Sequence, residues 1–315
     1  MANVYVIGGA NIDIFANSVN KIIPEDSNIS NITFSFGGVA RNIAENLVNL
    51  GIDLYFISAF SNDTYGKSLY EDCRRIGFKL DYAKVVEGYP SSIYLAVMDN
   101  NHDMYVGCND MRIIDCIDNE LIDRLSNVIK EDDYVVLDTN LSEEILVYAF
   151  DNLKGHKVMD AISANKVHKL QRVINKVSIV KLNKIEAEMI SDTKLDSEDK
   201  IIELLTDLNR NGTKQAIIST KTGMYVGSNN EVYHYNHDQY NKNVVNATGA
   251  GDALLAGYLY GELHNGNIES KCCLGLANSI LTVRCEKSVA KSTINDVTKQ
   301  ITEMKITGGK IKVSD

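Results

Sequence analysis

Short apolar runs alternate along this chain with longer segments in which apolar residues recur at helical spacing. The apolar runs predict buried strands of a parallel sheet at residues 4–7, 54–57, 134–137, 179–182 and 216–219. Helical spacing covers residues 40–50, 65–76, 143–153, 184–190, 197–211 and 251–263. This alternation predicts an α/β layered fold with a mainly parallel central sheet, in which ligands bind at the carboxyl ends of the strands.

Two segments interrupt this alternation. Residues 14–36 and 84–107 contain β-type patterns, such as Thr33-Phe34-Ser35-Phe36, without an intervening helix. We expect them to form a small accessory sheet that covers the strand ends. The chain has no internal repeat and no Pro-rich linker, and its two prolines, Pro24 and Pro90, both fall in these segments. Residues 1–315 are therefore predicted to be a single domain.

Composition narrows the choice of partners. The net charge of -10 argues against nucleic acid, because a polyanion requires a concentrated cationic surface. A small anion held by a few amides and a metal ion remains compatible with this charge. The six cysteines contain no CxxC pair, which is typical of free thiols in a reducing compartment. No apolar run reaches the roughly 18 residues that span a bilayer. We therefore expect a cytoplasmic protein without membrane contact.

The most informative motif is Asn246-Ala247-Thr248-Gly249-Ala250-Gly251-Asp252, which directly precedes an apolar helical stretch. The three small residues leave backbone amides uncovered where the helix begins, and a helix N-terminus attracts anions. Asp252 follows within the same turn. A carboxylate there suits phosphoryl transfer, because the amides hold the phosphoryl group while the acid accepts a hydroxyl proton. An ordinary glycine-rich turn capped by Asp252 is the alternative.

Two polar segments predict a place for a sugar. Gly37 and Gly38 precede a helix in which Asn42 lies one turn further on, and the glycines allow a ligand to approach the backbone. Asn11 and Asp13 lie on one side of an extended segment after the first strand, where an amide and a carboxylate can bind vicinal hydroxyls. A plain glycine turn and a solvated strand end are the respective alternatives.

Asn183 and Glu186 stand three residues apart at a predicted helix start. Glu186 either completes a capping box or orients waters on a phosphate-bound Mg²⁺, an ion that keeps much of its hydration. Three other motifs fail. Gly66-Lys67-Ser68 lacks the first Walker A glycine, the glycines near Gly8 lack the third glycine and the helix of a dinucleotide fingerprint, and His234 with His237 has no supporting ligand.

Together the motifs GGVARNIAENLVNLG, NKIE and NATGAGDALLAG resemble the ribokinase-like (PfkB-type) sugar and nucleoside kinases over essentially the whole chain. The resemblance implies a three-layer α/β/α domain with a β-lid at about residues 14–36 and 84–111, and a homodimer formed through that lid. It also implies ATP and Mg²⁺ as cofactors. Residues 90–111, 137–144 and 160–166 resemble the pseudouridine kinases within this family, which implies transfer of phosphate to the 5′-hydroxyl of pseudouridine.

The resemblance also assigns roles to residues. It implies that Asp252 is the catalytic base and that Gly249, Ala250 and Gly251 form the anion hole. It implies that the substrate is held by Asn11, Asp13, Gly38, Asn42, Asn140 and Lys166. It implies that the nucleotide is bordered by Asn183, Ser219, Thr220, Gly223, Thr248, Gly249, Gly251 and Asn278. Glu186 and Asn183 would serve the metal, mainly through water.

Two departures from the family pattern affect these expectations. Asn246 replaces the Asp that more commonly opens the second signature, which bears on a monovalent cation such as K⁺. Residues 219–223 form a shorter nucleotide loop than the family's usual one. Other readings also stand beside the main one: a kinase of ribose, uridine or adenosine, a non-catalytic nucleoside-binding regulator, and, more distantly, a dinucleotide-dependent oxidoreductase.

Overall fold

The computed structural model describes residues 2–101, 103–239 and 242–311. Residues 1, 102, 240–241 and 312–315 belong to the predicted single domain, and residue 102 to the predicted β-lid, but they lie outside the described residues. No helix in the described ranges is both long and apolar enough to cross a membrane.

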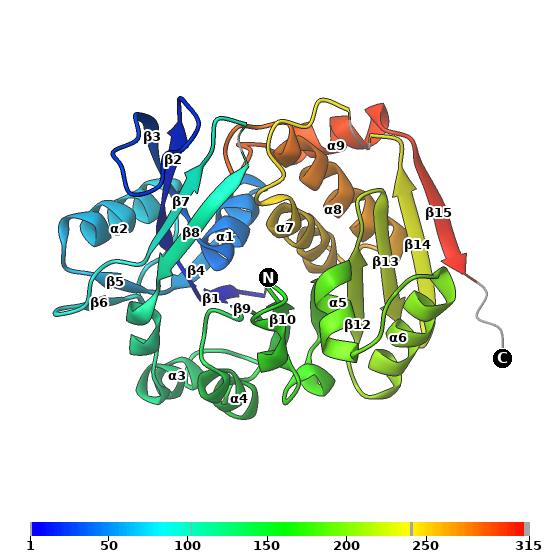
Figure 1. Cartoon of the computed structure of the whole chain (residues 1–315). Helices are drawn as coiled ribbons and strands as arrows, with labels where there is room; N and C mark the ends of the chain where they lie inside the picture. Colours follow the sequence, from blue (N-terminus) through cyan, green and yellow to red (C-terminus); the bar gives the residue numbers. More distant parts are fainter. Residues whose placement is uncertain (1, 102, 240–241, 312–315) are drawn as a thin grey trace.

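A nine-stranded sheet forms the centre of the molecule (Figure 1). Its strands are β1 (Val4–Ile7), β4 (Leu54–Ile57), β9 (Tyr134–Asp138), β10 (His156–Asp160), β11 (Ile179–Asn183), β12 (Gln215–Ser219), β13 (Gly223–Ser228), β14 (Glu231–His237) and β15 (Ile306–Ile311). They are ordered β15-β14-β13-β12-β11-β10-β9-β1-β4. The pairs from β4 through β12 are parallel, whereas β13, β14 and β15 add antiparallel pairs at one edge.

Helices cover both faces of this sheet, as the predicted three-layer architecture requires. They are α1 (Val39–Asn49), α2 (Thr64–Ile76), α3 (Asn119–Ser126), α4 (Glu143–Asn152), α5 (Lys184–Ser191), α6 (Glu198–Arg210), α7 (Ala250–Leu263), α8 (Ile268–Val283) and α9 (Ile294–Glu303). One hydrophobic core packs α3, α4, α5 and α6 against the sheet, and the other packs α1, α2, α7, α8 and α9.

Strand alternation explains why there are two cores. Successive side chains of a strand point to opposite faces of the sheet. In β1, Tyr5 and Ile7 enter the core under α3 and α4, while Val4 and Val6 enter the core under α1 and α7. All four are at most 3% exposed. Full burial of an aliphatic side chain such as Val6 or Ile7 contributes about 1.5–3 kcal/mol, so the sheet is anchored on both faces.

A four-stranded sheet projects beside α1 and α2 (Figure 1). It consists of β2 (Asn11–Ser18), β3 (Ser30–Gly37), β7 (Ile93–Met98) and β8 (Met104–Asp110), in the order β3-β2-β7-β8. Because Cα partners share a face, Asp13 and Tyr94 lie on one face, and Ile14, Phe34 and Leu95 on the other. Phe34 is 61% exposed and Leu95 is 37% exposed, so the second face leaves apolar surface uncovered.

The predicted fold class is confirmed, and the predicted strand at residues 4–7 is β1. Residues 84–86, expected in the accessory sheet, instead form β6 (Lys84–Val86), which pairs with β5 (Ala59–Ser61). Contacts outside the small sheet hold this strand: the Lys84 amide donates to the Ser58 carbonyl, and the Lys84 ammonium contacts Asp118. The pattern also missed β10 and the antiparallel edge, whose charged and glycine residues weaken the apolar signal.

Candidate active site

The first turn of α7 presents free backbone donors. Gly249 is its N-cap residue, with φ of 80°, and a Cβ there would lie 1.8 Å from the Ser288 carbonyl oxygen. Only glycine tolerates this conformation and this approach. Among the described residues, the amides of Gly251 and Asp252 have no acceptor. The turn therefore has the geometry of an anion-binding helix N-terminus.

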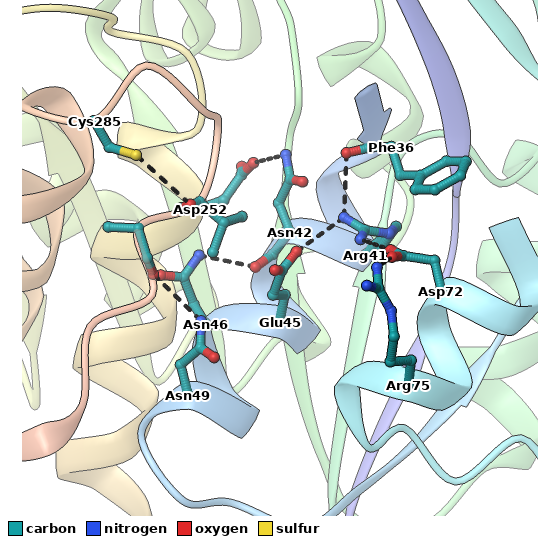
Figure 2. A network of polar contacts seen from close by, with 12 residues as sticks. Phe36, Arg41, Asn42, Glu45, Asn46, Asn49, Asp72, Arg75, Asp252 and Cys285 are labelled. Carbon is teal, nitrogen blue, oxygen red and sulfur yellow. Dashed lines mark hydrogen bonds and ion pairs between the residues drawn. The ribbon is translucent and has the colours of Figure 1, made fainter. Parts of the chain in front are cut away.

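Asp252 lies in this turn and is 7% exposed. The Asn42 side-chain amide donates to its Oδ2 at 2.9 Å, which joins α7 to α1 (Figure 2). Its Oδ1 has no hydrogen-bond partner in the part of the chain that the structure describes. Burial, reinforced by the charge of Asp160, raises the pKa of Asp252 to about 7, although Lys181 and the Asn42 amide act in the opposite direction. The carboxyl group is therefore poised to exchange a proton near neutral pH.

A row of charged side chains crosses the sheet beneath α7. Asp138, Asp160 and Lys181 are Cα partners on the adjacent strands β9, β10 and β11. Two residues earlier, the same row consists of Val136, Val158 and Ile179, which belong to the core under α7. The sheet surface thus changes from apolar to charged just where the carboxyl ends of its strands meet the first turn of α7.

Asp138 braces the ends of three segments. Its Oδ2 accepts from the amide of Gly9 at 3.1 Å and from the amide of Ala40 at 3.0 Å. Asn140 adds two bonds, from its backbone amide at 2.9 Å and from its side chain at 3.1 Å. Burial raises the pKa of Asp138, and these four donors counteract that shift. The carboxylate is saturated and holds the neighbouring turns in place.

The predicted sugar residues lie around the start of α1. The Asn11 side chain donates to Asp13, and burial raises the pKa of Asp13 to about 6 against the effects of Asn11 and Arg41. Gly38 has φ of 104°, and a Cβ there would lie 2.4 Å from the Gly9 carbonyl oxygen. Asn42 Oδ1 is buried and has no partner among the described residues. An orphaned acceptor in this position suits a ligand hydroxyl.

Asn140 and Lys166 also contact each other. The Lys166 ammonium donates to Asn140 Oδ1 at 2.6 Å. Burial lowers the pKa of Lys166, while the charge of Asp138 opposes that effect. The pair therefore joins the Asp138 brace and adds donors and acceptors at the carboxyl end of β9.

Asn183 and Glu186 form the capping box that was the alternative reading of this motif. Glu186 accepts from the Asn183 amide at 2.7 Å and from its side chain at 2.6 Å, and it is 0% exposed. Burial raises the pKa of Glu186 and Lys181 opposes this shift. The described residues contain no cluster of three or more His, Cys, Asp or Glu side chains that could hold a metal directly. A carboxylate has about four acceptor positions, and the capping box fills two of those of Glu186.

The predicted nucleotide residues fall into three places. Ser219 and Thr220 lie at the β12–β13 turn, where Thr220 Oγ1 accepts from the Gly223 amide at 3.1 Å. The Thr248 amide donates to Asn246 Oδ1 at 2.9 Å, so Asn246 shapes the turn before α7. Asn278 is only 1% exposed and donates to Ala253 and Asn46 inside the protein. Its amide nitrogen therefore serves the packing of α8 against α1 and α7.

Arg41 points to the other side of α1 from Asn42 (Figure 2). Its guanidinium bonds Asp72 at 2.6 Å, Glu45 at 3.0 Å and the Phe36 carbonyl at 3.2 Å. This network borders a cavity of about 850 Å³. α1 thus separates a structural ion-pair network from the polar site at Asp252.

Sequence reasoning missed the individual roles of Asp138, Asp160 and Lys181. Asp138 and Asp160 stood only inside segments quoted for resemblance. The available signal was a charged residue two positions after a buried apolar one, most clearly Lys181 in the run Ile179-Val180-Lys181-Leu182. Burying a charge is costly unless it is paired, so such a lysine indicates a polar site.

Comparison with known proteins supplies the class. A model of the pfkB family carbohydrate kinases matches residues 1–295. Pseudouridine kinase of Escherichia coli (strain K12) is 34% identical over 256 residues, which are 81% of this chain and 82% of that protein. Guanosine-inosine kinase of Exiguobacterium acetylicum is 26% identical, over 82% of this chain and 87% of its own. The chain therefore belongs to the pfkB family, and it is a carbohydrate or nucleoside kinase.

Solved structures agree on the fold. Arabidopsis thaliana ribokinase, complexed with ribose and ATP, superposes with a TM-score of 0.79 at 18% identity, covering 96% of this chain and 99% of its own. Kinases of this family use ATP, generally with Mg²⁺. The three-layer fold and the second sheet predicted above are thus those of a ribokinase-like protein.

Proposed function

We propose that this protein transfers the γ-phosphoryl group of ATP to the 5′-hydroxyl of pseudouridine, giving pseudouridine 5′-phosphate and ADP. The observation that carries the proposal is Asp252, a buried carboxylate whose Oδ1, like the amides of Gly251 and Asp252, has no partner among the described residues. The 34% identity to the Escherichia coli pseudouridine kinase supports the choice of substrate.

In the proposed reaction the 5′-oxygen attacks the γ-phosphorus as its proton passes to Asp252. The bond between the γ-phosphorus and the β,γ-bridging oxygen breaks, and ADP leaves. The turn at Gly249, Ala250 and Gly251 would hold the moving phosphoryl oxygens, because the amides of Gly251 and Asp252 have no other acceptor among the described residues. Asn42 orients Asp252 through its 2.9 Å hydrogen bond.

The ribose would bind between α1 and the small sheet. Asn11 and Asp13 offer an amide and a carboxylate on one strand, and Asn42 offers its orphaned oxygen. Gly38 lets the start of α1 approach Gly9 closely, because a Cβ there would lie 2.4 Å from the Gly9 carbonyl oxygen. We place the base toward Asn140 and Lys166, whose polar groups can match the two carbonyls and two N–H groups of the ring.

The nucleotide would lie across the end of β12, near Ser219, Thr220, Gly223 and Thr248. We retain Asn278 only as a support for this region, since its amide is engaged inside the protein. Glu186 and Asn183 fit an outer-sphere role toward Mg²⁺, because Glu186 keeps acceptor capacity beyond its capping box. The bound ion would neutralise phosphate charge. A monovalent cation such as K⁺ near the Asn246 turn belongs to the proposal as well.

A parallel assay of ATP consumption with pseudouridine, uridine, ribose and adenosine tests the substrate. We expect the highest kcat/KM with pseudouridine. A preference for another nucleoside or for ribose would keep the kinase class and replace the substrate, and the 26% identical guanosine-inosine kinase makes inosine a useful fifth arm. Nucleoside binding without ATP turnover would favour a regulator. Replacing K⁺ with tetramethylammonium in the same assay tests the monovalent ion.

The uncovered face of the small sheet supports a homodimer. Exposed Ile32, Phe34, Leu95 and Val106 lie on the face opposite Asp13. Contiguous apolar surface of this kind marks an association site. We expect a dimer by sedimentation, and Phe34→Glu should convert it to monomer; a wild-type monomer would contradict this. We also propose a cytoplasmic location, which the six free cysteines support.

A further inference from the structure

Lys181 is a lysine at a position where the strand pattern demands an apolar residue. On β11, Val180 and Leu182 enter the core under α5, while Ile179 faces the core under α7. Lys181 therefore faces α7 as well, and its side chain is only 7% exposed. An aliphatic residue there would continue the apolar face that Ile179 begins on β11, so the buried ammonium requires a separate reason.

The ammonium lies directly against the turn that carries Asp252. A Cβ built on Gly251 would be 2.6 Å from Lys181 Nζ and 3.2 Å from Cε, so the lysine occupies the space of a missing side chain. Asp160 fixes the ammonium from the neighbouring strand, with Nζ 3.1 Å from its Oδ2. Asp160 is itself held, because its Oδ1 accepts from the Ile162 amide at 2.8 Å.

The surroundings keep this lysine charged. Its Nζ forms an ion pair with Asp160 at 3.1 Å, and such a partner favours the ammonium over the neutral amine in a buried place. Around Asp252 itself, Asn42 reaches from α1, Asp138 from β9, Asp160 from β10 and Lys181 from β11. Lys181 is the cation in that set, and its effect on Asp252 opposes those of the carboxylates of Asp138 and Asp160.

We propose that Lys181 is a positioning residue of the phosphoryl transfer: held by Asp160 beneath Gly251, it fixes the anion-hole turn and supplies positive charge where negative charge gathers. This inference rests on the proposed role of Asp252. A preorganised charge in a site with little water stabilises the transition state without reorganisation. The side chain keeps Asp252 in its proton-accepting form and leaves the binding of sugar and nucleotide to other residues.

The test compares two buried lysines. Lys181→Met keeps the length of the side chain and removes its charge. Lys271→Met is the matched control, since Lys271 is also buried at 8% exposure and pairs with Glu262, which lies near the opposite end of α7 from Asp252. Both variants remove the cationic partner of one carboxylate, so both should lose stability.

Only the first variant should change catalysis. We expect Lys181→Met to lower kcat roughly tenfold to hundredfold with both KM values within about threefold. The acidic limb of its kcat/KM profile should move up by about one pH unit. Lys271→Met should keep the wild-type kcat and limb. The assay uses pseudouridine or whichever of uridine, ribose or adenosine the wild-type enzyme phosphorylates.

Three outcomes decide the matter. Wild-type kcat and limb in folded Lys181→Met would overturn the inference, as would an equal loss in both lysine variants. Should Lys181→Met not fold, Lys181→Arg decides instead: retained charge should leave the acidic limb in place, and a limb moved by one unit would overturn the inference. Asp252→Asn is assayed alongside to separate the proposed role of Lys181 from that of Asp252. Near-normal turnover in Asp252→Asn would refute the proposed base, whatever the result for Lys181.

Discussion

Asp138 and Asp252 are both buried carboxylates at the same edge of the sheet, yet their hydrogen bonding differs sharply. Asp138 accepts four bonds from three residues, Gly9, Ala40 and Asn140. Asp252 accepts one, from Asn42, and keeps Oδ1 without a partner in the described residues. Because its acceptor positions are filled, Asp138 acts as a structural brace. The second remains free to accept a proton, so acceptor capacity distinguishes the two roles better than burial does.

Replacing each aspartate by asparagine should lower turnover at Asp252 and stability at Asp138. Asp252→Asn preserves shape and an acceptor for Asn42 but cannot take a proton. We expect turnover to fall by about 10²–10⁴-fold while ATP and substrate still bind by calorimetry, because general-base help is worth that much. Near-normal turnover would remove Asp252 from the base role and dissolve the contrast with Asp138.

Asp138→Asn should act on the fold. One of its two oxygens becomes an NH₂ group, which cannot accept from the amides of Gly9 and Ala40. Leaving buried donors unpaired costs about 1–3 kcal/mol each, so we expect the free energy of unfolding to drop by about 2–4 kcal/mol in urea titration. Asp252→Asn is the control and should lose none. Equal stability of the two variants would mean that the hydrogen-bond count misjudges Asp138.

Asp13 extends the comparison to the sugar end. Asp13→Ala removes the carboxylate that Asn11 holds. We expect nucleoside binding to weaken by about tenfold to hundredfold, the value of one or two hydrogen bonds to a charged group, with ATP binding unchanged. Calorimetry with each ligand checks this, and weaker ATP binding with intact nucleoside binding would reverse the two ends of the site.

A change in pH should have the smallest of these effects on activity and stability. Because burial raises the pKa of Asp252 to about 7, kcat/KM should halve near pH 7 and fall about tenfold per unit further below. The sign for stability is opposite. A folded pKa raised from 3.8 means extra protons bound in the folded state, so this contribution is full below about pH 4 and lost as pH rises through 7. Asp252→Asn should remove the contribution of this carboxyl to both dependences, and an unchanged stability curve would contradict the assignment.

The sequence by itself determined the local features. The strand and helix repeats predicted most of the layers, because burial of one face produces a repeat of apolar residues within a few positions of the sequence. The glycines at Gly249 and Gly251 and the acid that follows them marked the anion-binding turn for the same reason. Asn183 and Glu186 also contact each other as their spacing predicts, although the bonds observed are those of a capping box.

Only the tertiary structure decided which distant residues share the site. Asp138, Asp160 and Lys181 become neighbours through the parallel register of β9, β10 and β11, whose connections have no fixed length in the sequence. The approach of Asn42 to Asp252 likewise depends on how α1 packs against α7. Local pattern encodes which face of an element is buried; the partners across that face follow from packing, and the charges gathered there set the pKa of Asp252.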